Sequence, residues 1–133
     1  MNADAGDFWG EPISTYSRAQ AIEDGELVDV SIAAQEAGIT FPTALTRHVW
    51  NECVEVPPKL KGQQDESGRL WDVLYMAAHA VRAATRAGKG SDRLPFTRRV
   101  RKAEGHRVER LLFVVGPGDD AAPVVTIEYP EDD

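Results

Sequence analysis

Apolar side chains recur at helical spacing between residues 69 and 87, and this is the strongest pattern in the chain. The intervals alternate between four and three residues, at Leu70, Leu74, Ala77, Val81 and Ala84. A stripe with this period lies on one face of a helix and packs against a core. Residues 88–91, Gly-Lys-Gly-Ser, are typical of a helix end. The sequence therefore predicts one long central helix.

The period changes to that of strands in the last third of the chain. Residues 94–101 alternate in polarity, residues 108–115 are largely apolar, and residues 124–129 are rich in β-branched side chains. Turns are indicated at 104–106 (Glu-Gly-His) and at 116–120 (Gly-Pro-Gly-Asp-Asp). Three strands joined by short turns predict an antiparallel meander with the long helix covering one face.

Shorter elements are predicted before the long helix. Ser17 and Gln20 have the spacing of a capping box, and Gly25 stands where a glycine often ends a helix. Residues 26–30 alternate as a half-buried strand does. Ser31 is then expected to cap a second short helix over residues 32–37.

A third short helix is predicted to begin at Pro42, because proline favours the first helical position. Pro57 and Pro58 would end it, and the polar residues 57–68 would form a surface loop. The buried face of this helix would carry Leu45, Val49, Cys53 and Val56.

These elements predict an α+β fold. Short N-terminal helices and a long central helix would pack on a C-terminal three-stranded antiparallel sheet. The chain has 133 residues, and we expect a single domain over residues 13–133. Residues 1–12 are small and acidic and predict a flexible arm, in which Phe8 and Trp9 either dock on the domain or anchor a partner.

Charge is segregated along the chain. Residues 1–66 hold 12 acidic and 4 basic side chains, residues 67–111 hold 4 and 11, and residues 112–133 hold 6 and none. The net charge is −7 and the isoelectric point is near 4.9, which is unlike a protein that coats DNA. A basic middle between acidic ends makes the surface strongly dipolar and biases which partners can approach.

The basic middle supplies the first candidate site. If Val100 pairs near Val108, its side chains share one face of a hairpin and could bind phosphates or an acidic protein surface. The alternative is that the acidic N-terminal half neutralises them through surface ion pairs. The cluster comprises Arg93, Arg98, Arg99, Arg101, Lys102, Arg107 and Arg110.

The acidic segments supply the second candidate site. Carboxylates spaced like phosphates could mimic a nucleic-acid backbone and occupy a groove lined by Arg and Lys. The alternative is that turns and termini favour aspartate, and that net charge aids solubility. One group, Glu23, Asp24, Glu26 and Asp29, lies at a helix–strand junction, and a second lies near the C-terminus at Asp119, Asp120, Glu131, Asp132 and Asp133.

Catalytic and metal-binding signatures are weak. No G-x-S-x-G, H-E-x-x-H or P-loop motif occurs, and no pair of His and Cys residues has the spacing of a zinc site. We expect no catalytic residue, no metal and no cofactor, and an enzyme acting through His79 or Cys53 is the least favoured alternative. Convergence through the fold stays open for His48, Cys53, His79 and His106.

The setting is expected to be cytoplasmic. A single cysteine is compatible with a reducing compartment. No apolar run approaches the roughly 20 residues of a membrane span, and the acidic start lacks the features of a secretory signal. No membrane partner is expected.

Five segments then carry a family resemblance. They are LVDVS at 27–31, PTALTRHVW at 42–50, GRLWDVL at 68–74, GPGDD at 116–120 and PVVTI at 123–127. In this order they resemble a family of small uncharacterised bacterial proteins carried mostly on plasmids, phages and other mobile elements, over about residues 13–130. The resemblance implies no catalytic residues. It implies a setting in which small acidic proteins often inhibit host defence, as anti-CRISPR and anti-restriction proteins do.

The sequence thus predicts a non-enzymatic binding protein. It would inhibit or modulate a bacterial defence nuclease or other nucleic-acid-handling complex by charge-complementary docking. The alternative is an accessory protein that binds nucleic acid directly through the Arg-rich hairpin. The predicted partner-binding residues are Glu23, Asp24, Glu26, Asp29, Arg98, Arg99, Arg101, Lys102 and Arg107.

Overall fold

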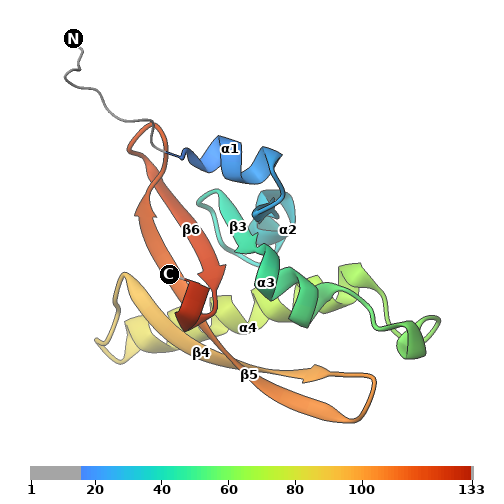
Figure 1. The fold of residues 1–133 in the computed structure, drawn as a ribbon. Coiled ribbons are helices and arrows are strands. Elements are labelled where there is room, and N and C mark those ends of the chain that lie inside the picture. Colours follow the sequence, from blue (N-terminus) through green and yellow to red (C-terminus); the bar gives the residue numbers. More distant parts are fainter. Residues whose placement is uncertain (1–15, 133) are drawn as a thin grey trace.

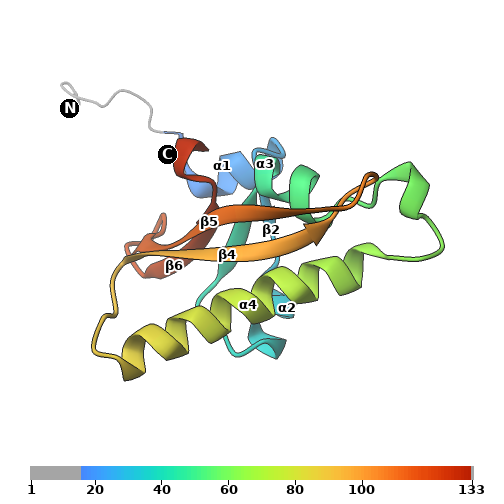
Figure 2. The ribbon, with the colours of Figure 1, turned by 90° about the horizontal axis from the view of Figure 1, so that it is seen from below.

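The computed structural model describes residues 16–132. The predicted arm at residues 1–12, with Phe8 and Trp9, lies outside this range. Five strands form one mixed sheet in the order β2–β3–β6–β5–β4 (Figure 1). Figure 2 shows the long helix α4 (Glu66–Arg86) along one face of this sheet, and α1 (Arg18–Glu23) on the opposite side. The strands are β2 (Leu27–Asp29), β3 (Thr43–Thr46), β4 (Arg93–Arg101), β5 (His106–Pro117) and β6 (Pro123–Glu128).

The C-terminal meander is confirmed. β5 pairs antiparallel with both β4 and β6, and the predicted alternation places Phe96 and Val100 in the core. The sheet is larger than the predicted three strands, because β3 joins β6 in parallel and β2 joins β3 antiparallel. The meander is therefore one part of a five-stranded mixed sheet.

The predicted helix from Pro42 is wrong over its first residues. Thr43–Thr46 is a central strand, and the carbonyl of Pro42 accepts a hydrogen bond from Val125 N at 2.8 Å. Thr43, Ala44 and Leu45 are all buried, as expected of a strand covered on both faces. The helical segment begins with α3 (Arg47–Val49), capped by the Thr46 hydroxyl at 3.2 Å, and continues as the π-helix η1 (Trp50–Val54).

The first two helix starts were predicted with mixed success. The capping box of Ser17 and Gln20 is confirmed at α1. Ser31 does not cap a helix but is the first residue of α2 (Ser31–Glu36), and its hydroxyl donates to Asp29 Oδ1 at 2.6 Å. Gly38, at φ +97°, follows the end of α2, where an L side chain would be strained.

The long helix is confirmed and begins three residues earlier than predicted. Asp65 caps it by accepting a hydrogen bond from Gly68 N at 2.7 Å. The preceding segment, predicted as a loop, contains the 3-10 helix η2 (Pro58–Leu60), whose Leu60 is buried. The core between α4 and the sheet includes Val73, Leu74, Ala77, Leu45, Leu111 and Ile127.

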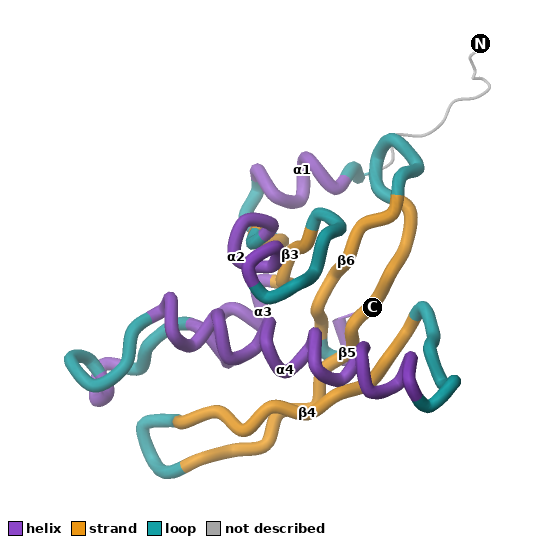
Figure 3. The backbone as a smooth tube through the Cα atoms, turned by 180° about the vertical axis from the view of Figure 1, so that it is seen from behind, coloured by secondary structure: helices purple, strands orange, loops and turns teal. Residues whose placement is uncertain are grey.

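β4 and β5 continue past the end of β6 as a two-stranded arm. β6 pairs with β5 only from Leu112 to Pro117, whereas residues 106–111 of β5 pair with β4 alone. Figure 3 shows this pair of strands running out along α4. From here on we call residues 96–111 of this strand pair the arm, as distinct from the flexible N-terminal segment predicted at residues 1–12.

Candidate functional site

The register of the arm divides its arginines between two faces. Val100 pairs with Arg107, the neighbour of Val108, and Arg99 pairs with Val108, so the expectation that Val100 pairs near Val108 is confirmed. Because side chains alternate across a strand, Arg98 and Arg107 share the helix-facing side of the arm. The prediction that all these arginines share one face is therefore wrong. The outer face carries Arg99, Arg101 and Arg110.

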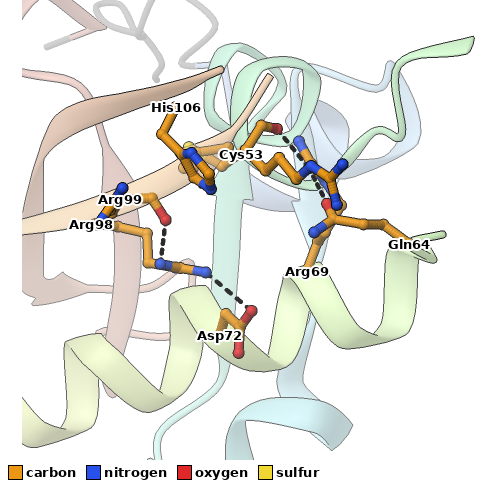
Figure 4. Close-up of a pocket in the computed structure, with 9 residues that line it drawn as sticks. Cys53, Gln64, Arg69, Asp72, Arg98, Arg99 and His106 are labelled. Carbon is orange, nitrogen blue, oxygen red and sulfur yellow. Dashed lines mark hydrogen bonds and ion pairs between the residues drawn. The ribbon is translucent and has the colours of Figure 1, made fainter. Parts of the chain in front are cut away.

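A pocket of about 340 Å³ lies where the free edge of β4 meets the first turns of α4. In Figure 4, Arg98 and Asp72 lie on one side of this pocket and Arg69 and Gln64 on the other. We call it the basic pocket. Its charged and imidazole-bearing lining residues are Arg69, Asp72, Arg98, Arg99, Arg101 and His106.

Arg69 is the most buried charged group of this pocket, with 5% of its surface exposed. Its Nε donates to Val54 O at 3.1 Å, and its Nη1 donates to Gln64 Oε1 at 2.6 Å and to Arg101 O at 2.8 Å. All three acceptors are neutral, and within residues 16–132 nothing accepts a hydrogen bond from Nη2. Burial lowers the pKa of Arg69 from its ordinary value, and the nearby charge of Arg98 adds to this effect.

The other arginines differ in how firmly they are held. Arg98 Nη2 donates to Asp72 Oδ2 at 2.9 Å, and Arg101 Nη2 donates to Gln63 Oε1 at 2.9 Å. Three arginines of the arm, Arg99, Arg107 and Arg110, are exposed. Their side chains make no hydrogen bond or ion pair with another residue of the described range.

Lys102, a predicted partner-binding residue, is engaged inside the molecule. Its side chain is 17% exposed, and its Nζ lies 3.2 Å from Glu109 Oε2 and 3.2 Å from Glu52 Oε1. Glu109 Oε1 in turn accepts from the Tyr129 hydroxyl at 3.0 Å, and that hydroxyl lies 3.6 Å from Cys53 Sγ. These five residues form a largely buried polar network behind the basic pocket.

The thiol of Cys53 lies in this network at 1% exposure. Burial raises the pKa of Cys53 from its ordinary value, and burial likewise raises the pKa of Tyr129 well above its usual range. A nucleophilic cysteine needs an accessible thiolate. The environment of Cys53 therefore favours a protonated core thiol.

We call the group Glu23, Asp24, Glu26 and Asp29 the acidic junction, and all four of its residues are exposed. Glu23 and Asp24 lie at the end of α1, and Glu26 and Asp29 lie at either end of β2. Asp24 accepts a hydrogen bond from the Tyr16 hydroxyl at 2.7 Å, which raises the pKa of Tyr16 to about 12. All four carboxylates therefore lie on the surface, and their role in binding a partner stays a prediction.

Two of the C-terminal carboxylates, Asp119 and Asp132, serve the fold instead, and Asp133 lies outside the described residues. Asp119 accepts hydrogen bonds from Arg18 N at 2.9 Å and Ala19 N at 3.0 Å, and these bonds lower the pKa of Asp119. Asp132 accepts from Thr46 Oγ1 at 2.8 Å and lies 2.8 Å from His48 Nδ1. Burial opposes ionisation of Asp132, but its hydrogen bonds prevail and lower its pKa.

The four candidate metal ligands do not converge. His48 pairs with Asp132, Cys53 faces Tyr129, and His79 is exposed on α4. Cys53 and His106 both line the basic pocket. Within residues 16–132, no group of three His, Cys, Asp or Glu side chains has the arrangement of a metal site.

Comparison with known proteins places the chain in a family. The model of one family, described as a family of unknown function (DUF6573), matches residues 7–133. The chain belongs to DUF6573. No curated protein and no solved structure matches it. In the described part of this DUF6573 chain, no helix combines the length and apolarity that crossing a membrane requires.

Arg69, Glu109 and Tyr129 were missed as site residues by the sequence prediction. A signal for Arg69 was present, because it stands one helical turn before the buried Val73 on the stripe side of α4. A charged residue on an apolar stripe has to be paired or hydrogen-bonded. Glu109, a carboxylate within the largely apolar stretch 108–115, carried the same kind of signal.

Proposed function

We propose that this protein is a non-enzymatic binding protein that holds the phosphate backbone of a nucleic acid against its arm. The observation that carries the proposal is the set of exposed arginines without a partner in the described range, Arg99, Arg107 and Arg110. Because Arg107 lies on the other face from Arg99 and Arg110, the backbone would pass over the edge of β5 that residues 106–111 leave unpaired. The competing idea was internal neutralisation by the acidic half. The ion pairs of the arm fall on other residues, namely Arg98, Lys102, Glu104 and Glu109.

Guanidinium groups suit this task because they make paired, charge-assisted hydrogen bonds to phosphate oxygens. The arm offers no exposed Phe, Tyr or Trp for base stacking, and His106 is its one exposed aromatic ring, so stacking would contribute little. Contacts would therefore be to the backbone, tolerant of sequence and sensitive to salt. The acidic α1 end lies away from the arm in Figure 1, so the dipolar surface would orient the approach of a polyanion.

The test is the double variant Arg107→Gln/Arg110→Gln in a fluorescence anisotropy titration with single- and double-stranded oligonucleotides. We expect at least about a tenfold loss of affinity. The slope of log K against log salt should fall in magnitude by roughly 1.8 for the double strand and roughly 1.4 for the single strand, since two phosphate contacts are lost. Arg99 is left unchanged because it also lines the basic pocket.

The matched control is Arg82→Gln/Arg86→Gln, which removes the same charge from exposed positions on α4. These positions lie about 20 and about 26 Å along the helix from Arg69, at about 1.5 Å per residue. Equal affinities in the two double variants would contradict the proposal, because they would show that only net charge matters.

A second function is supported by the exposed acidic junction. Four carboxylates fall within seven residues at positions 23–29. The mobile-element setting implied by the sequence resemblance favours an inhibitor of a host defence nuclease. In this candidate function the acidic junction docks on the basic nucleic-acid path of that nuclease and blocks it.

The inhibitor proposal makes a separate prediction. Glu23→Gln/Asp24→Asn/Glu26→Gln/Asp29→Asn should abolish inhibition of DNA cleavage by a purified restriction or CRISPR nuclease that the unmodified protein inhibits. The amide side chains can still accept the bonds from Tyr16 and Ser31. The variant Arg107→Gln/Arg110→Gln should inhibit normally. Inhibition that survives the acidic change, or is lost with the arginine change, would refute docking through the acidic junction.

A further inference from the structure

We propose that the basic pocket binds one phosphate group, as the phosphomonoester of a nucleotide or of a nucleic-acid end. This site is distinct from the exposed arginines Arg107 and Arg110, and the proposal does not depend on the arm binding a nucleic-acid backbone. The argument rests on the charge of the pocket, the burial of Arg69 and the size of the space.

The pocket carries an excess of positive charge. Four arginines line it, and Asp72 is the one carboxylate among its lining residues in the described range. Asp72 is already paired with Arg98 at 2.9 Å. The charges that remain uncompensated by an ion pair in the pocket are those of Arg69, Arg99 and Arg101. An anion is the ligand that such a site favours.

Arg69 supplies the second observation. A buried charge is costly unless it is paired, and the three acceptors of Arg69 are two backbone carbonyls and one amide. Its Nη2 is enclosed and has no acceptor among residues 16–132. An anion in the pocket would offer this guanidinium a counter-charge. Contact with Nη2 itself requires a small movement of the side chains that enclose it.

The arrangement also favours phosphate over a carboxylate. Arg69 is fixed by three hydrogen bonds, and Arg98 is fixed by Asp72 on the other side of the pocket (Figure 4). A tetrahedral phosphate presents oxygens to both sides, whereas a carboxylate presents two oxygens in one direction. Guanidinium groups held in place before binding lose little freedom when the ligand arrives.

The size and lining of the pocket define what else is recognised. A volume of about 340 Å³ lies at the lower end of the roughly 300–1,000 Å³ of small-ligand pockets. Among its lining residues in the described range there is no Phe, Tyr or Trp, so a base could stack only on the imidazole of His106 or on a guanidinium plane. Recognition would therefore come mainly from the contacts to the phosphate.

The experiment is an NMR titration of ¹⁵N-labelled protein with inorganic phosphate, followed through the Nε–H signals of the arginines. We expect the Arg69 signal to shift and saturate, and affinity to fall at least about tenfold in Arg98→Gln, because a charge-assisted hydrogen bond is lost. Arg69→Met should abolish binding, and Arg98→Gln keeps the test decisive if Arg69→Met does not fold. Arg86→Gln, an exposed change on the same helix, should bind normally.

Unshifted Arg69 signals, or equal affinities in Arg98→Gln and Arg86→Gln, would overturn the proposal. Two further titrations identify the source of the phosphate. AMP binding as tightly as a 5′-phosphorylated hexanucleotide indicates a free nucleotide. Tighter binding of the hexanucleotide, lost when its 5′-phosphate is removed, indicates a strand end. If Arg107→Gln/Arg110→Gln keeps its affinity for oligonucleotides, the proposed function of the arm is contradicted, but the Arg69 signal should still shift with phosphate. The two proposals therefore fail separately.

Discussion

Replacing Ala44 with proline is expected to destabilise the protein by more than about 1–3 kcal/mol, which is the cost of the buried backbone acceptor left without its N–H partner, because the proline ring also has to be accommodated in a central strand. Ala44 lies in the middle of β3, with Asp29 of β2 opposite it on one side and Thr126 of β6 on the other. Proline has no N–H to donate to a backbone hydrogen bond between strands, and in sheets it is confined to the edges. It should therefore break the pairing of β3 with β6, which joins β3 to the meander. Urea unfolding followed by circular dichroism measures the effect.

The control is Glu66→Pro, at the first residue of α4. The preceding Asp65 is extended, at φ −135° and ψ 163°, which is the conformation that a following proline favours. The expected change is within about 1 kcal/mol. If residues 42–46 formed the first turn of a helix, Ala44→Pro would be tolerated in the same way. Similar unfolding midpoints for the two variants would contradict the assignment of β3.

This contrast shows why part of the fold was predictable and part was not. The stripe of α4 and the alternation of β4 repeat over many residues, so the period identifies the element. Thr43, Ala44 and Leu45 are buried on both faces and show neither period. Their strand conformation depends on parallel pairing with β6, about 80 residues further along the chain. The local signals, Pro42 and the helical spacing of Leu45 with Val49 and Cys53, both favoured a helix.

The candidate site was predictable as a region but not in its details. Composition alone located the basic residues of the arm. Lys102 and Arg107 look equivalent in the sequence, yet Lys102 is paired with Glu52 and Glu109 whereas Arg107 is exposed. That difference depends on which residues of β4 and β5 pair with each other and on where η1 packs. Neither is encoded by local spacing, because each requires the assembled sheet.

Lys102→Met is expected to destabilise the protein by about 3 kcal/mol, the lower end of the range for breaking a buried ion pair. The lower end applies because the Lys102 side chain keeps 17% exposure. The variant leaves the Glu109 carboxylate, at 10% side-chain exposure, without its positive partner. Glu52, at 44% exposure, can turn to water and adds little to the loss. Urea unfolding at neutral pH measures the difference.

The double variant Lys102→Met/Glu109→Gln should recover most of this loss. The glutamine removes the unpaired charge while its oxygen can still accept the hydrogen bond from Tyr129. The comparison of single and double variants isolates the interaction between the two residues. Arg107→Met, an exposed change five residues away, should lie within about 0.5 kcal/mol of the unmodified protein. If Lys102→Met proves equally harmless, the buried network contributes nothing to folding. Lys102 would then return to the residues available for a partner.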